Sequence, residues 1–390
     1  MQVWLWVGFI TLVLALLALD LFVVNRKDQV VSVRKAVMFT LFFATCGALF
    51  SVAVYYIYDA NLWGYGERFV QSTFTMQADK AKIPLADRAT WTPPANSEAA
   101  LAAANPGKTA AVLYLTGWLI EYALSMDNIF VIALIFTYFR IPGKYQHRVL
   151  FWGIMGALIL RGLMIGLGSG LVKEFHYILY FFGAFLVYTA LKLAFGGENE
   201  YEPEKSPVFR IAKKIYPLTP NFDGHNFFTR INGARFATPL FLVLVMVEGT
   251  DVVFAVDSIP AIFSITQEPF IVFTSNIFAI LGLRSLYFAL AGAMRSFEYL
   301  KYSLAFVLAF VGVKMLLPGW ADLAGWMNTK WNLTLPTPEL KITPLWSLGI
   351  IAGSLALGVI ASLLRKSPPE EPTKSAESGA THQSQEQKAS

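Results

Sequence analysis

Cysteine and histidine are scarce in this chain of 390 residues, which contains one cysteine, Cys46, and four histidines. A single cysteine excludes an intramolecular disulfide and the paired cysteines of a zinc finger. Charged residues are also few, at 15% of the chain, whereas hydrophobic residues make up 56%. The sequence has no P-loop of the form Gly-x-x-x-x-Gly-Lys, which argues against an ATP-driven pump. This composition is typical of an integral membrane protein rather than of a soluble domain.

Long apolar runs occupy most of the chain, and its mean hydropathy is +0.52. A helix of about 20 apolar residues crosses the hydrocarbon core of a bilayer, which is about 30 Å thick. We therefore predict an all-α polytopic membrane protein with about nine transmembrane helices. The first run lacks the basic start and cleavage site of a signal peptide, so we expect it to remain as a span. The predicted spans cover residues 3–24, 36–58, 110–137, 148–172, 176–195, 237–265, 270–293, 301–318 and 345–364.

Basic residues gather in every second connection between these runs, and this pattern sets the expected orientation. They lie within residues 26–35, 140–148, 205–235, 295–301 and 365–366. Loops rich in lysine and arginine face the cytoplasm. We therefore expect an outer N-terminus and a cytoplasmic C-terminus, the parity that nine spans give. These loops account for the formal net charge of +5, which needs no nucleic-acid partner.

One pattern of polar residues occurs twice inside apolar runs. Its members are Glu121, Asp127 and Asn128 in the first copy and Glu248, Asp251, Asp257 and Ser258 in the second. An arginine inside a later apolar run follows each copy, at Arg161 and at Arg284. Each copy begins a unit of three spans, and an odd number of spans makes the second unit enter the membrane from the opposite side. We therefore predict two inverted three-helix repeats, an arrangement found in many secondary transporters.

The repeats divide the chain into segments of different character. Asn232-Gly233 between two short runs is a strong signal for a β-hairpin, and residues 99–104 favour a short helix. Tryptophans within 319–346 predict anchoring at the membrane interface. The predicted segments are two N-terminal transmembrane helices (1–58), an outer periplasmic loop (59–108), the first repeat (109–196), a cytoplasmic loop with the hairpin (197–236), the second repeat (237–318), a second outer loop (319–344), the last transmembrane helix (345–365) and a disordered cytoplasmic tail (366–390).

Carboxylates inside a membrane are costly, at about 2.5–3.5 kcal/mol each on insertion scales, and are usually functional. All side chains of the repeated pattern offer hard oxygen donors, and no histidine or cysteine lies beside them. Such a set favours Mn²⁺, Mg²⁺ or Ca²⁺ over Zn²⁺ or copper. The candidate metal ligands are Glu121, Asp127, Asn128, Glu248, Asp251 and Asp257.

The spacing of the two acids in each copy limits how they can act. Six residues along an ideal helix rotate a side chain by about 240° and move it by about 9 Å, so one straight helix does not present both acids to one ion. Either the helix is broken at the pattern, or the acids serve successive positions on a path. Pro260 offers a break in the second copy.

A structural alternative is that the buried acids form ion pairs with basic residues of neighbouring spans. Arg161 and Arg284 are the expected charge partners, because both lie in the middle of a span. Asp20, near the end of the first span, is expected at the membrane interface. Ion pairing and cation binding are compatible if the arginines hold the carboxylates in place while no cation is bound.

These motifs resemble those of the TerC family of integral membrane proteins, which is named for tellurium resistance and includes Alx-like members. The resemblance rests on the stretches 121–131, 247–261 and 274–288 and covers roughly residues 110–320. It implies a bacterial inner-membrane protein whose outer side is periplasmic, a role in manganese homeostasis and efflux, and an arrangement similar to that of the LysE-type exporters. The segment 59–108 looks longer than in the family pattern and the tail from Ser367 is foreign to it, but neither contains the acidic motifs.

The residues and the resemblance together predict a secondary transporter that exports a divalent cation, with Mn²⁺ as the cargo that the resemblance implies. Proton entry is the candidate coupling reaction, and the expected partners are the lipid bilayer, metal ions and other membrane proteins. The alternative is a non-transporting membrane partner that handles metal or tellurium stress and assists metal loading of exported proteins. We expect no enzymatic activity and no cofactor, because Ser258 has no histidine within a span to activate it.

Overall fold

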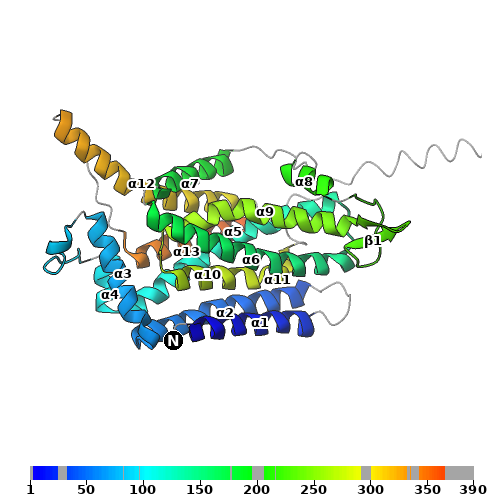
Figure 1. Cartoon of the computed structure of the whole chain (residues 1–390), viewed down its shortest axis with the longest axis horizontal. Coiled ribbons are helices and arrows are strands. Elements are labelled where there is room, and N and C mark those ends of the chain that lie inside the picture. Colours follow the sequence, from blue (N-terminus) through cyan, green and yellow to red (C-terminus); the bar gives the residue numbers. More distant parts are fainter. Residues whose placement is uncertain are drawn as a thin grey trace, which may run out of the picture.

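The protein is a bundle of long helices that run side by side along its longest axis (Figure 1). This computed structural model describes residues 3–24, 33–81, 83–95, 97–175, 178–195, 206–215, 217–290, 300–331, 334 and 342–364. One end of the bundle, the cap end, carries α3 (Tyr65–Lys80), α4 (Glu98–Ala104) and the start of α1. The other end, the hairpin end, carries the strands β1 (Phe228–Ile231) and β2 (Ala234–Ala237).

Eight stretches of the described residues are long and apolar enough to cross a membrane. This finding confirms the prediction of an all-α polytopic membrane protein, whereas the inverted repeat remains a prediction. The ninth predicted span, 301–318, is helical as well and lies in α12 (Leu300–Trp331), which is not among the eight. The eight are formed by α1 (Val3–Val24), α2 (Val33–Asp59), α5 (Pro106–Tyr138), α6 (Gly143–Glu174), α7 (Ile178–Phe195), α9 (Pro239–Phe263), α10 (Pro269–Leu281) together with α11 (Leu283–Leu290), and α13 (Pro344–Leu364).

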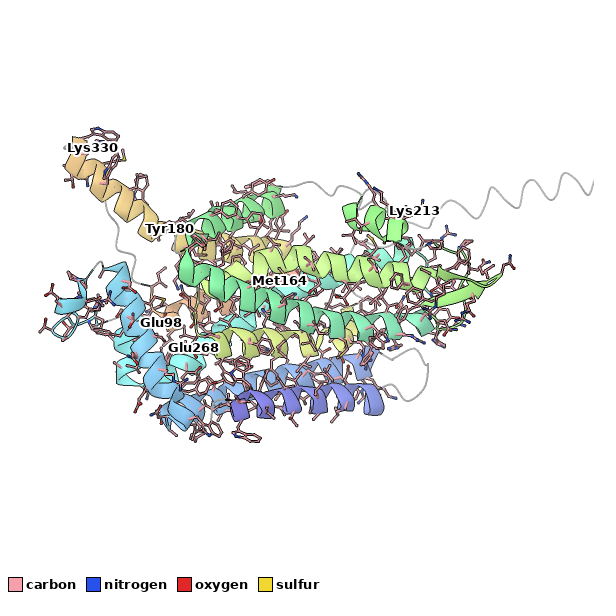
Figure 2. The ribbon with its side chains drawn as sticks, viewed as in Figure 1. Glu98, Met164, Tyr180, Lys213, Glu268 and Lys330 are labelled. Carbon is pink, nitrogen blue, oxygen red and sulfur yellow. The ribbon has the colours of Figure 1, made fainter. Side chains whose placement is uncertain are left out.

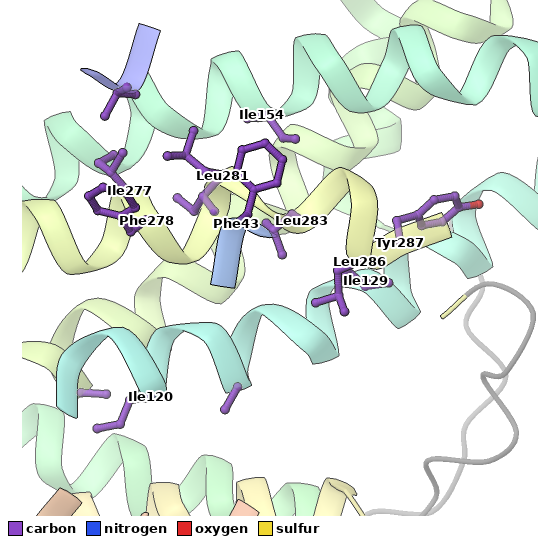
Figure 3. Packing of buried hydrophobic residues seen from close by; sticks show 14 of the residues in the cluster. Phe43, Ile120, Ile129, Ile154, Ile277, Phe278, Leu281, Leu283, Leu286 and Tyr287 are labelled. Atoms are coloured by element: carbon purple, nitrogen blue, oxygen red, sulfur yellow. The ribbon is translucent and has the colours of Figure 1, made fainter. Parts of the chain in front are cut away.

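The broken pair α10–α11 is the central element of the bundle. From Phe270 to Leu281, every residue of α10 except Phe273 is buried. The break falls at Gly282, where a Cβ atom would approach the Cβ of Phe43 on α2 to 3.2 Å. Figure 3 shows the apolar packing on both sides of the break, where Leu281 and Leu283 lie among side chains of α2, α5 and α6. Discontinuous helices at this depth are common where transporters bind their cargo.

The predicted outer segment 59–108 is largely helical, but its helices α3 and α4 are not among the stretches long and apolar enough to cross a membrane. The short helix expected at 99–104 is present as α4, whose N-terminus is capped by the hydroxyl of Ser97. Asn105 caps α5 in the same way, and Pro106 occupies the first turn, where its missing N–H costs nothing. The sequence analysis did not identify α3.

The predicted hairpin is confirmed. Strands β1 and β2 pair in antiparallel fashion across Asn232 and Gly233, whose φ angles of 51° and 82° match a type I′ turn. Ahead of the hairpin, α8 (Pro207–Ile215) packs against α9. The acidic stretch that begins at Glu198 and the tail from Ser367 lie outside the described residues.

Two expectations about helix ends are wrong. Helix α9 runs through Pro260 and ends at Phe263, one residue short of Ser264, so the helix continues for less than one turn beyond the proline. Helix α12 continues to Trp331, so residues 319–331 are helical rather than part of a loop. The side chains of Trp320, Trp326 and Trp331 are exposed along this extension, which fits the predicted interfacial anchoring.

Candidate functional site

A fully buried arginine organises the centre of the bundle. Arg161 on α6 donates from Nε and Nη2 to the two carboxylate oxygens of Asp251 on α9, at 3.1 and 2.8 Å. Its Nη1 donates to Oδ1 of Asn276 on α10, at 3.1 Å, and forms an ion pair with Glu121 on α5. We call these four residues the ion network. The network joins acids of both motif copies to one arginine.

The ion network is stable because the guanidinium group is fully engaged. A forked contact with Asp251 matches the planar geometry of arginine and carboxylate. A buried arginine without such partners would be strongly destabilising. The neighbouring polar side chains Thr274 and Ser275 bond back to carbonyl groups of their own helix, which leaves Asn276 as the polar residue of α10 that reaches Arg161. Both acids were predicted candidates, and Arg161 was a predicted charge partner.

A cavity of about 30 Å³ lies next to the ion network, between α5, α6, α9 and α11. Most of its lining is apolar. The polar side chains that line it are Asn128, Thr250, Asp251, Arg284 and Tyr287. The volume exceeds the roughly 10–15 Å³ that one water molecule requires, so a small hydrated species fits. Asn128 belongs to the first motif copy and Asp251 to the second, so the two copies meet at this cavity.

The cavity and the ion network lie at different depths. Helices α5 and α10–α11 run from the cap end to the hairpin end, and α6 runs the opposite way. Glu121, Arg161 and Asn276 are each closer to the cap end than the cavity residues of the same span. Asp251, the fourth member of the ion network, itself lines the cavity, so the cavity extends from the ion network toward the hairpin end. The cavity lies on the hairpin side, which the basic loops predict to be cytoplasmic.

Several buried polar atoms of α5 and α9 have no hydrogen-bond partner among the described residues. They include Oδ1 of Asn128, Oγ of Ser125 and Oγ of Ser258. Such atoms are uncommon in folded proteins, because each costs the loss of its hydration. Asn128 lines the cavity, so its unfilled oxygen acceptor is available there to a cation or to ordered water. Ser125 was not a predicted site residue.

Glu248 occupies a different environment from the acids of the ion network. Its carboxylate packs directly against Gly156 of α6, where a Cβ atom would collide with both carboxylate oxygens. Its Oε2 is buried without a partner, and no basic side chain among the described residues pairs with it. The glycine of α6 thus makes room for this acid. Among the described candidate ligands, Glu248 is the carboxylate best placed to change its protonation.

Among the described side chains, the acid that pairs with Arg284 is Asp20 of α1 rather than an acid of the repeated pattern. Nη2 of Arg284 donates to Oδ2 of Asp20 at 3.0 Å and to the backbone carbonyl of Asp20 at 2.7 Å. Asp20 is only 3% exposed, so the expectation that it lies at the interface is wrong. The physical reason is that α1 packs on α10 and carries its acid into the bundle rather than to the lipid surface.

The described side chains do not form a complete metal centre. No group of three or more acidic, histidine or cysteine side chains that could hold a metal ion occurs among them. The positions of Asp127 and Asp257 are helical, but both side chains lie outside the part of the chain that the structure describes. The structure brings together Glu121, Asp251 and Arg161 and places Asn128 on the cavity wall beside Asp251.

Sequence reasoning missed Asn276 and underrated Asp20. Asn276 lies in the second arginine motif, eight residues ahead of Arg284, and a polar amide within an otherwise apolar run is a signal that could have identified it. Further acids lie at the cap end, as Figure 2 shows for Glu98 and Glu268. There Tyr58 donates a hydrogen bond of 3.2 Å to Glu268 in the connection between α9 and α10.

Comparison with known proteins places this geometry in context. Residues 107–369 match the model of the family described as integral membrane protein TerC. The chain is 41% identical over 361 residues to the uncharacterized membrane protein STKORF319 of Myxococcus xanthus, covering 93% of this chain and 92% of that protein. It is 41% identical over 314 residues to a protein of Escherichia coli K12 named as membrane-bound redox modulator Alx, covering 80% of this chain and 85% of that protein. An uncharacterized membrane protein of Rickettsia felis is 36% identical over 361 residues, covering 93% and 98%. No solved structure matches the chain.

Proposed function

Because the chain belongs to the TerC family of integral membrane proteins, we propose that it is a secondary transporter that exports a divalent cation, Mn²⁺, from the cytoplasm. The observation that supports the proposal is the meeting of the two motif copies at one buried cavity. Asn128 and Asp251 supply hard oxygen atoms to the cavity, and Thr250 lies beside them. Hard oxygen donors suit Mn²⁺ better than soft or imidazole-preferring ions.

The transport cycle that we propose begins with a cation entering the cavity from the hairpin end. Asp251 belongs to the cavity and to the ion network, so a cation at Asp251 competes with Arg161 for the same carboxylate. Binding weakens the bond between α6 and α9 on the cap side of the cavity. The network then opens toward the cap end, and the cation leaves on that side.

Proton coupling falls to Glu248 in this proposal. A buried carboxylate without a basic partner favours its neutral, protonated form. A cation beside it favours the charged form, so cation binding releases the proton. Release of this proton offsets one of the two positive charges that a divalent cation brings into the buried region. Arg161 cannot take this role, since its guanidinium remains protonated under all physiological conditions.

A second candidate is a membrane partner that moves no metal by itself. The ordered cap end favours it, because a groove with a volume of about 480 Å³ lies there between α2, α3 and the start of α5. The E. coli relative carries a redox description, but a dithiol exchange within one chain would require a second cysteine beside Cys46. The groove is open and could receive a segment of another protein.

Flux through the purified protein distinguishes these candidates. The full-length chain is reconstituted alone in sealed vesicles that contain a dye quenched by Mn²⁺. The transporter predicts quenching that saturates with Mn²⁺ concentration and depends on an imposed pH gradient. Quenching no faster than in empty vesicles, with the protein inserted and folded, would support the partner candidate instead.

A further inference from the structure

Arg284 presents an electrostatic problem for a cation site. It lines the same cavity as Asp251 and Asn128, and the residue is only 2% exposed. A permanent positive charge on the cavity wall repels a divalent cation strongly where water is excluded. A cavity that binds cations therefore needs this charge to be neutralised or held away.

Asp20 supplies that neutralisation from outside the repeats. Its Oδ2 and its backbone carbonyl both accept from Nη2 of Arg284, at 3.0 and 2.7 Å. Its second oxygen, Oδ1, is buried and has no partner among the described residues. Asp20 lies on α1, ahead of the region 107–369 that matches the family model. The two arginines of the repeated pattern thus have different partners: Arg161 binds the acids of both copies, and Arg284 binds α1.

We propose that Asp20 is a positioning residue of the cation site, which holds Arg284 on the α1 side of the cavity, so that Arg161 is the one arginine with which the cation competes for Asp251. This inference rests on the proposed transport function. When the pair separates, Arg284 can turn toward Asp251, because both line one cavity. Arg284 and the cation then compete for one carboxylate, and Asp20 determines which of them binds. Helix α1 is therefore part of the transport unit rather than a peripheral span.

A purely structural role for the same pair makes a different prediction. In that case Asp20 and Arg284 only tie α1 to α11, and the loss of either partner lowers folding stability. The apparent affinity for the cation, measured on the folded fraction, then stays as in the wild type. The dependence of the transport rate on cation concentration separates the two roles. A change in KM reflects a change at the cation site, whereas a change in membrane abundance reflects a change in folding stability.

The experiment uses the full-length chain in sealed vesicles and measures Mn²⁺ uptake across a range of concentrations. The variants are Asp20→Asn, Arg284→Gln and the double variant, with Asp79→Asn as a control, because Asp79 forms an exposed ion pair with Arg88 at the cap end. We expect Asp20→Asn to raise KM by about tenfold or more, since the freed arginine competes at the site. The double variant should return KM to within about threefold of the wild type, because no charge is left unpaired. Asp79→Asn should change nothing.

Folding is monitored by membrane abundance and by the melting temperature in detergent. If Asp20→Asn is too unstable to assay, Arg284→Gln decides: removing the positive charge from the cavity wall should lower KM, whereas a purely structural role leaves KM as in the wild type. A wild-type KM in Asp20→Asn, or a KM raised equally in the double variant, overturns the inference while leaving the transport function intact. An absence of uptake by the wild-type protein itself overturns the transport function and this inference with it.

Discussion

Arg161 is the residue on which the centre of the bundle depends most. Its guanidinium has partners on α5, α9 and α10, and the side chain is only 1% exposed. Removing one member of a buried charged cluster leaves the others unpaired, which costs about 3–5 kcal/mol. We therefore expect Arg161→Gln to reduce membrane abundance sharply and to lower the melting temperature in detergent. Arg161→Lys retains the charge but loses the two-point contact with Asp251. Its abundance and melting temperature should therefore lie between those of the wild type and of Arg161→Gln.

The matched control for this prediction is Arg88→Gln. Arg88 pairs with Asp79 at the cap end, where the two side chains are 21% and 48% exposed. An exposed ion pair contributes less than about 1 kcal/mol, so this variant should accumulate and melt like the wild type. Equal stability of Arg161→Gln and Arg88→Gln would contradict the assignment of the ion network.

Metal selectivity also belongs to the residue scale. The oxygen donors at the cavity are the amide of Asn128, the hydroxyl of Thr250 and the carboxylate of Asp251. We expect Mg²⁺ and Ca²⁺ to compete with Mn²⁺ for uptake more effectively than Zn²⁺ does, because the site lacks imidazole and thiolate ligands. Competition assays in reconstituted vesicles measure this order. Inhibition by Zn²⁺ that persists after all four histidines are replaced would argue against a hard-donor site.

At this scale, the sequence was informative about which residues matter and much less about their partners. Charged residues within apolar runs identified Glu121, Asp251 and Arg161 without any structure, because burial of a charge demands a reason. The partner of Arg284 was not predictable, since Asp20 is 264 residues away in the chain and looks like an interfacial residue. Pairing across helices depends on how the helices pack, which their periodicity does not reveal.

At the scale of elements, α6 and α9 meet through the fit of one glycine to one acid. A Cβ atom at Gly156 would overlap the carboxylate of Glu248, whereas at Gly166 on the same helix it would meet nothing within 4 Å. Gly156→Ala should therefore cost about 1–3 kcal/mol by overpacking and should impair transport. Gly166→Ala should be neutral or slightly stabilising, because alanine favours helix. Melting temperatures and uptake rates of the two variants test this contrast.

Equal melting temperatures and equal uptake rates of the two glycine variants would contradict this packing of α6 against α9.

The elements themselves were largely predictable, because a span of about 20 apolar residues has few alternatives inside a bilayer. The break at Gly282 was not predictable, and Pro260 was the wrong candidate. A proline in the last turn of a helix leaves the helix intact, whereas Gly282 lies where α2 approaches closely.

At the scale of the whole molecule, the topology can be tested independently of transport. The basic loops predict that the hairpin end faces the cytoplasm and the cap end the periplasm. A reporter that is active only in the cytoplasm, fused after Lys366, should therefore be active. The same reporter inserted at residue 95, in the cap segment, should be inactive. Reversal of either result would reject the predicted orientation and the direction of transport that depends on it.

The measurement that tests the central claim most directly is Mn²⁺ uptake into inverted membrane vesicles by Asp127→Asn and Asp257→Asn, one variant from each motif copy. Membrane abundance is measured on the same preparations. If the two copies form one cation pathway, each variant should remain in the membrane at normal levels and lose uptake, because each removes a hard anionic ligand from a buried path. Normal abundance together with normal uptake in both variants would contradict the account.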